Sequence, residues 1–134
     1  MDRSTDWLKQ AERDLKAAEN SAVGGYHEWA AFEAQQSAEK AVKALVESLH
    51  GASRGHSITS ILRQLESSVE VPEAILEAAR ELDKVYVTAR YPNGFAAGSP
   101  GDYFSEKTSI HLIQHARSIA EFCRSKIHRP RTGD

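Results

Sequence analysis

The chain has 134 residues, which fits one domain with a sizeable core. Hydrophobic residues make up 40% and charged residues 27%, and the formal net charge of −2 excludes an overall basic field for nucleic acid. The single cysteine, Cys123, excludes an internal disulfide, which suits a protein of the reducing cytoplasm. We expect Cys123 itself to lie in the core. No apolar run is long enough to cross a bilayer and no signal-peptide pattern opens the chain, so no membrane contact is expected.

Apolar residues at helical spacing predict an all-α protein of about five helices. In chain order they cover about residues 4–24, 26–50, 58–65, 72–90 and 104–128. Ser4-Thr5-Asp6 supplies capping residues for the first helix, and Pro92 ends the fourth because it disfavours helical backbone at Tyr91. The short connections predict an antiparallel, up-and-down bundle that forms one domain over residues 1–128, followed by a flexible tail over 129–134.

Polar side chains fall on the apolar arc of the second helix. Gln35 projects within the arc, Glu39 lies at its edge beside Phe32, and Lys43 lies just beyond. Unpaired burial of an amide or a carboxylate is costly, so both groups need partners. Glu39 and Lys43 are four residues apart, and one interpretation is a simple ion pair along the helix.

The fourth helix has the same anomaly on a very wide apolar arc. Asp83 and Arg90 project inside this arc, two turns apart, with Tyr86 close by. Arg90 also occupies the last turn, where a cation suits the helix dipole. One interpretation is structural: Asp83 and Arg90 pair across the bundle or face a second subunit. The width of the arc itself favours a homodimer.

The alternative interpretation gathers these polar side chains and two loop tyrosines into one ligand-binding pocket. Its residues would be Gln35, Glu39, Lys43, Asp83, Tyr86, Arg90, Tyr91 and Tyr103. Arginine and lysine hold phosphate or carboxylate, and tyrosines stack on a base. Residues 91–103, which contain several glycines, would form a mobile cover over Glu39, Lys43 and Arg90. His56, at the start of the third helix, either caps that helix or points into the pocket, and the first interpretation, a helix cap, is favoured.

Four segments of the chain resemble the HEPN domain family, in its RYP-bearing branch, over roughly residues 5–125. They are WLKQAERDLKAAE, YHEWAAFEAQQSAEKAVKALVESLHG, GHSITSIL and ELDKVYVTARYPNG. The resemblance implies an antiparallel helical bundle, usually a homodimer, and a frequent genomic partnership with a minimal nucleotidyltransferase in a toxin–antitoxin-like pair. It also implies nucleotide or RNA binding and, in some branches, RNA cleavage.

The ribonuclease branches carry an arginine, four to six further residues and then a histidine near the start of the last long helix. No arginine stands at that distance before His111 or His115, and Arg124 lies too close to His128. The missing motif favours a binding module over an enzyme, and a ribonuclease toxin with a non-standard site is the alternative. His111 and His115 share a helical face without a third ligand, so no metal and no cofactor are expected.

Overall fold

The computed structural model describes residues 2–127, and it confirms the all-helical bundle. Its helices are α1 (Ser4–Val23), α2 (His27–Ser48), α3 (Ile58–Leu65), α4 (Glu73–Asp83), α5 (Val85–Thr88) and α6 (Glu106–Ile127), with two 3₁₀ turns, η1 (Pro92–Gly94) and η2 (Pro100–Asp102). No strand occurs among these residues, and none of their helices has the length and apolarity that a membrane crossing requires.

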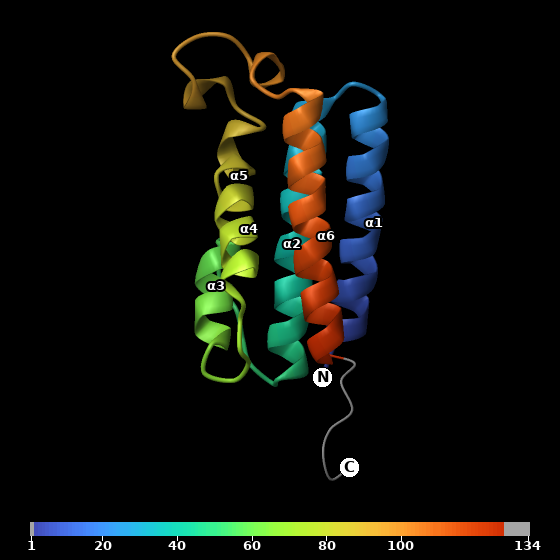
Figure 1. Ribbon diagram of the computed structural model, residues 1–134, viewed down its shortest axis with the longest axis vertical. Helices are drawn as coiled ribbons and strands as arrows, with labels where there is room; N and C mark the ends of the chain where they lie inside the picture. The colour runs from blue at the N-terminus through green and yellow to red at the C-terminus, as the bar shows by residue number, and fades with distance from the viewer. Residues whose placement is uncertain (1, 128–134) are drawn as a thin grey trace.

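The three long helices α1, α2 and α6 lie side by side along the long axis, and α3, α4 and α5 form a second group beside them (Figure 1). Alanines line the buried face of α2, where Ala34, Ala38 and Ala41 are fully buried. Such small side chains let neighbouring helices approach closely, because the distance between helix axes depends on the side chains at the contact. Cys123 is buried in the core as predicted, and this burial raises the pKa of its thiol to about 12.

The predicted fourth helix is divided at Lys84 into α4 and α5. Lys84 keeps helical dihedral angles (φ −62°, ψ −25°). The hydroxyl of Thr88 donates a hydrogen bond of 3.0 Å to the carbonyl oxygen of Lys84. A threonine that bonds to the carbonyl four residues earlier often bends a helix, which accounts for the division.

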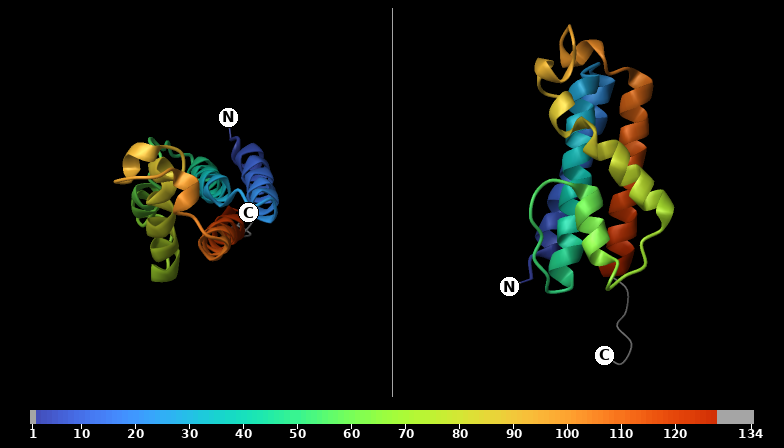
Figure 2. Two further views of the ribbon diagram at one scale, coloured as in Figure 1. Left: turned by 90° about the horizontal axis from the view of Figure 1, so that it is seen from above. Right: turned by 90° about the vertical axis from the view of Figure 1, so that its left-hand side faces the viewer.

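The connection between α2 and α3 runs back along α2 before α3 begins (Figure 2). The carbonyl oxygen of His56 therefore lies beside Gln35, whose Nε2 donates to it at 3.4 Å. The pairs α1–α2 and α3–α4 are antiparallel, as predicted, whereas α3 runs in the same direction as α2 (Figure 1). This return positions residues 49–57 over the middle of α2 and brings the start of α3 to the end of α4.

The segment between α5 and α6 is irregular, as predicted, and projects beyond one end of the bundle (Figure 1). Its rings Phe95 and Tyr103 stack with centroids 4.0 Å apart and planes 7° apart. The Tyr103 hydroxyl donates to the carbonyl oxygen of Ala97, and Asp102 accepts the backbone N–H of Ser99 at 2.8 Å. The loop therefore holds its shape largely through contacts within itself.

Candidate functional site

A buried carboxylate, Glu39, lies at the centre of a polar cluster on α2. Glu39 is 5% exposed. Its carboxylate accepts hydrogen bonds from Gln35 Nε2 at 3.2 Å, from Lys43 Nζ at 3.1 Å and from His56 Nδ1 at 3.1 Å. Gln35 is fully buried, and its amide oxygen accepts a bond of 2.8 Å from Gln36. The polar groups predicted on the apolar arc thus find the partners that their burial requires.

His56 joins this cluster to an aromatic side chain of α5. Its imidazole is about half exposed and stacks on Tyr86, with ring centroids 4.5 Å apart and planes 19° apart. The interpretation of His56 as the helix cap was wrong: the hydroxyl of Ser57 accepts the N–H of Ser60 at 3.1 Å and caps α3. The return of residues 49–57 along α2 places His56 between Glu39 and Tyr86 instead.

Asp83 serves as a second cap for α3. Its carboxylate accepts the backbone N–H groups of Ile58 at 2.8 Å and Thr59 at 3.0 Å, and the hydroxyl of Ser57 at 3.3 Å. A carboxylate at this end of a helix also suits the helix dipole. No ion pair forms between Asp83 and Arg90 in the described part of the chain, so the predicted pairing of these two residues across the bundle is not observed.

Arg90 lies among three aromatic rings. Its guanidinium carbon is 4.4 Å from the ring centroid of Phe32, 4.6 Å from that of Tyr86 and 5.1 Å from that of Tyr91. Nε donates to the carbonyl oxygen of Tyr86 at 3.0 Å. Within residues 2–127 no carboxylate pairs with this cation. Its terminal nitrogens are therefore the donors that an anion can engage.

The structure brings the predicted site residues into one chain of contacts, with one exception. The residues so connected are Gln35, Glu39, Lys43, Asp83, Tyr86, Arg90 and Tyr91. A hollow of about 170 Å³ among His56, Ser57, Asp83 and Tyr86 links Asp83 to the rest. The exception is Tyr103, whose ring stacks on Phe95 and whose hydroxyl donates to Ala97, both within its own loop.

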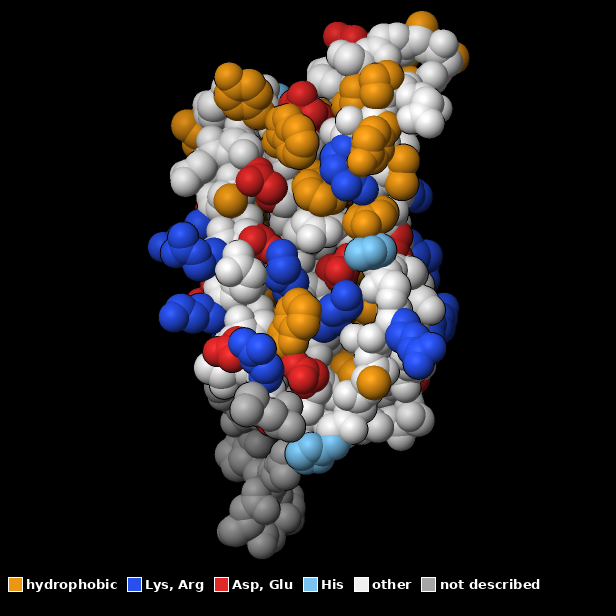
Figure 3. Space-filling view, turned by 180° about the vertical axis from the view of Figure 1, so that it is seen from behind, with side chains coloured by type: hydrophobic (Ala, Val, Ile, Leu, Met, Phe, Trp, Pro, Cys, Tyr) orange, Lys and Arg blue, Asp and Glu red, His pale blue; other side chains and the backbone are white. Residues whose placement is uncertain are grey.

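Two aromatic side chains that the sequence analysis left out of the site complete this face. Phe32 packs between Trp29 and Tyr86, with ring centroids 6.3 Å and 6.2 Å away, and Trp29 is 47% exposed. Figure 3 shows hydrophobic side chains gathered around a basic one in the upper half of this face. Phe32 lies three residues before Gln35 on α2, so its helical position already placed it next to the polar cluster.

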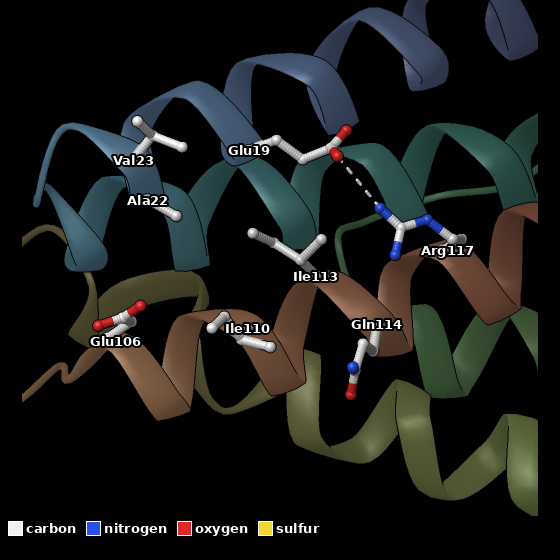
Figure 4. Close-up of a pocket in the computed structure, with 8 residues that line it drawn as sticks. All are labelled: Glu19, Ala22, Val23, Glu106, Ile110, Ile113, Gln114 and Arg117. Atoms are coloured by element: carbon white, nitrogen blue, oxygen red, sulfur yellow. Dashed lines mark hydrogen bonds and ion pairs between the residues drawn. The ribbon is translucent and has the colours of Figure 1, made fainter.

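A separate hollow of about 280 Å³ between α1 and α6 has a different character (Figure 4). Its walls are mainly the apolar side chains of Ala22, Val23, Ile110 and Ile113. The charged groups on its rim include the ion pair Glu19–Arg117, with nitrogen and oxygen 3.3 Å apart. Because that arginine already has a carboxylate partner, this hollow is a weaker candidate for an anion than the surroundings of Arg90.

The histidines of α6 form no comparable site. His111 is exposed and His115 half-buried, beside a hollow that Glu81 also lines. No group of three metal-binding side chains occurs in the part of the chain that the structure describes. Arg124 pairs with Glu12 of α1, whereas His128 lies outside the described residues.

The fold and this face define a small all-helical protein in which a polar cluster around a buried carboxylate lies beside an arginine held among aromatic rings. The family model for the HEPN domain matches residues 4–126, and the chain belongs to the HEPN domain family. No curated protein matches the chain significantly.

Three solved structures are similar to nearly the whole chain. TT1696 from Thermus thermophilus is 38% identical with a TM-score of 0.92, over 94% of this chain and 99% of that one. ST0689, an archaeal HEPN homologue, is 41% identical with a TM-score of 0.81, over 95% and 99%. An HEPN domain protein from Thermotoga maritima (tm0613) is 32% identical with a TM-score of 0.78, over 93% and 99%.

Proposed function

We propose that this HEPN domain protein is a binding module of the RYP-bearing branch that takes a nucleotide or another phosphate-bearing anion at Arg90. The proposal rests on the contacts of this guanidinium: it lies against three rings and has no carboxylate partner within residues 2–127. A phosphate matches the planar donors of arginine. Tyr91, 49% exposed, and Trp29, 47% exposed, offer surfaces on which a base can stack.

Glu39 acts in this proposal as a positioning residue. It accepts the Nδ1–H of His56 and holds the imidazole against Tyr86, close to Arg90. With Nδ1 directed at a carboxylate, Nε2 is the ring nitrogen left for a ligand. Lys43 compensates the charge of Glu39, so the cluster adds little net charge, and Arg90 supplies the attraction for the anion.

The partners in the proposal are a second copy of the chain and a minimal nucleotidyltransferase, in a toxin–antitoxin-like pair. The resemblance to the RYP-bearing branch supports both. The exposure of Val87 at 49%, on the wide apolar arc of the fourth predicted helix, agrees with a homodimer. The single buried Cys123 agrees with a cytoplasmic location. No cofactor is part of the proposal.

One observation favours the alternative, a ribonuclease with a non-standard site. His56 is held by Glu39 near a cation, and a carboxylate-oriented histidine is a common general base. Cleavage of a labelled RNA that His56→Ala abolishes would establish this alternative. A rate equal to that of a protein-free blank supports the binding module.

Calorimetric titration with uridine monophosphate, adenosine monophosphate and pyrophosphate tests the proposed function. We expect binding by the wild type and a loss of at least about tenfold in Arg90→Ala, which equals about 1.4 kcal/mol. Arg80→Ala is the matched control, because Arg80 is a partly exposed α4 arginine already paired with Glu73 at 2.7 Å. No binding by the wild type, or an equal loss in both variants, would overturn the proposal.

A further inference from the structure

The same face carries a second aromatic and charged hollow at its other end, beside Trp7 of α1. We propose that this hollow is a second base-binding subsite that takes a guanine base, so that the preferred ligand is a dinucleotide or a longer single strand. The inference rests on the proposed function of Arg90 and adds a second point of attachment to it.

An unbroken series of contacts joins the two ends of the face. Lys43 donates to Glu39 at 3.1 Å, and its ammonium lies 5.9 Å from the ring centroid of Trp7. Glu39 in turn bonds to His56, whose ring stacks on the tyrosine that Arg90 covers. Figure 3 shows basic, acidic and hydrophobic side chains following one another down the middle of this face. A ligand held at one end therefore meets polar and aromatic groups all the way to the other.

The hollow at Trp7 is larger than the one at His56. Its volume is about 530 Å³, compared with about 170 Å³, and it is lined by Arg3, Asp6, Trp7, Gln10 and Glu47. Arg3 and Asp6 pair with each other at 3.1 Å, and Gln10 donates to Asp14 at 2.9 Å. The half-buried indole and the Glu47 carboxylate are then the groups best placed to select a ligand. An indole provides a broad stacking surface for a base.

Glu47 gives the subsite its chemical preference. One of its carboxylate oxygens is buried and has no hydrogen-bond partner among residues 2–127. A buried carboxylate oxygen without a donor costs free energy, so a ligand in the hollow that brings N–H groups to Glu47 is favoured. Guanine presents a ring N–H and an amino group side by side, and these match the two oxygens of a carboxylate. A guanine stacked on Trp7 therefore fits both groups.

The spacing along α2 indicates more than one nucleotide. Arg90 lies over Phe32, and Trp7 lies at Lys43. These two α2 positions are about 16 Å apart along the axis, because each helical residue rises about 1.5 Å. A single nucleotide does not span that distance, whereas two linked nucleotides can occupy both ends.

The test compares 5′-phosphorylated UpG, GpU and UpU with uridine monophosphate by calorimetry. In the wild type, we expect a guanine-containing dinucleotide to bind at least about tenfold tighter than the monophosphate, because its second base stacks on the indole. Trp7→Ala and Glu47→Gln should remove this advantage and leave the monophosphate unaffected. Arg90→Ala should weaken both ligands. Glu66→Gln, at an exposed carboxylate, is the control for Glu47→Gln.

The outcomes separate this inference from the proposed function. Equal affinity for the dinucleotides and the monophosphate, or equal losses for both in Trp7→Ala, overturns the subsite and leaves the Arg90 site standing. Equal affinity for UpU and the guanine dinucleotides overturns the choice of guanine. Binding of the dinucleotide that depends on Trp7 but not on Arg90 overturns the proposed function instead, and no binding at all overturns both. Trp7→Phe, which keeps an aromatic surface, should retain most of the affinity and guards against a folding defect in Trp7→Ala.

Discussion

Asp83 and Arg90 were predicted to lie two turns apart on one face of a single helix, yet their surroundings in the structure differ. The Asp83 carboxylate accepts three hydrogen bonds, from Ser57 and from the first two N–H groups of α3, at 3.3, 2.8 and 3.0 Å. Arg90 has rings and one carbonyl oxygen around it and no carboxylate within residues 2–127. A charge on an apolar arc is thus only a first signal. The partners decide whether it supports the fold or is available to a ligand.

The cluster around Glu39 offers the strongest test of this comparison, because it is the most buried of the charges. Glu39→Ala removes the acceptor of three donors and leaves Lys43 partly buried without its counter-ion. Breaking a buried pair from one side is strongly destabilising, so we expect a loss of about 3 kcal/mol in the free energy of unfolding. Urea unfolding followed by circular dichroism measures it.

Glu39→Gln is the matched variant, since it keeps the shape and an acceptor oxygen and should lose less. A loss below about 1 kcal/mol for Glu39→Ala would mean that water replaces the carboxylate and that the cluster contributes little to the fold.

Asp83 gives the next largest expected effect. Asp83→Ala leaves the first N–H groups of α3 without their acceptor, and loss of a capping residue costs about 0.5–2 kcal/mol. We expect a loss of about 2 kcal/mol, because a charged acceptor of two backbone donors is at the upper end of that range. Ser57→Ala, which removes the other cap of α3, is the comparison.

Hydrogen exchange of the α3 amides in Asp83→Ala should rise along with the global loss of stability. If the melting temperature and the exchange of α3 both stay unchanged, Asp83 is not a cap in solution, and its role in a ligand pocket becomes the better interpretation.

The sequence was sufficient for the parts of the site that lie on a single helix. Helical periodicity alone placed Gln35 and Glu39 on the buried side of α2, and both are buried. The partner of Asp83 was not predictable, because it is the start of another helix that lies 25 residues earlier in the chain. The position of His56 beside Glu39 depends on a connection that returns along α2, and nothing in the spacing of GASRGHS indicates that path. Local periodicity therefore predicts burial, whereas long-range contacts decide the partners.

Arg90, the second residue of the comparison, should contribute less to stability than Asp83. Arg90→Ala removes contacts with aromatic rings, each worth about 0.5–1 kcal/mol when partly exposed, and strands no buried carboxylate. We expect a loss of about 1.5 kcal/mol in the free energy of unfolding, the lower end of the sum over the three rings. A loss of about 3 kcal/mol or more would indicate a structural ion pair in solution.

Tyr103 is expected to have the smallest effect, and it decides what the loop does. The prediction that residues 91–103 cover the pocket requires this ring to contact the ligand or to hold the closed loop. In the structure the ring centroid lies 4.0 Å from that of Phe95, within the loop that projects beyond one end of the bundle (Figure 1). Because Tyr103 is 50% exposed, Tyr103→Ala should change the free energy of unfolding by about 0.5 kcal/mol or less. The same contacts lead us to expect nucleotide affinity within about twofold of the wild type, a change below about 0.5 kcal/mol.

Stopped-flow dissociation of a fluorescent nucleotide from Tyr103→Ala gives the sharper measurement, because a cover slows release even where it adds little affinity. Faster release from Tyr103→Ala with unchanged stability would establish the cover, whereas equal release rates would leave residues 91–103 as a connection between α5 and α6.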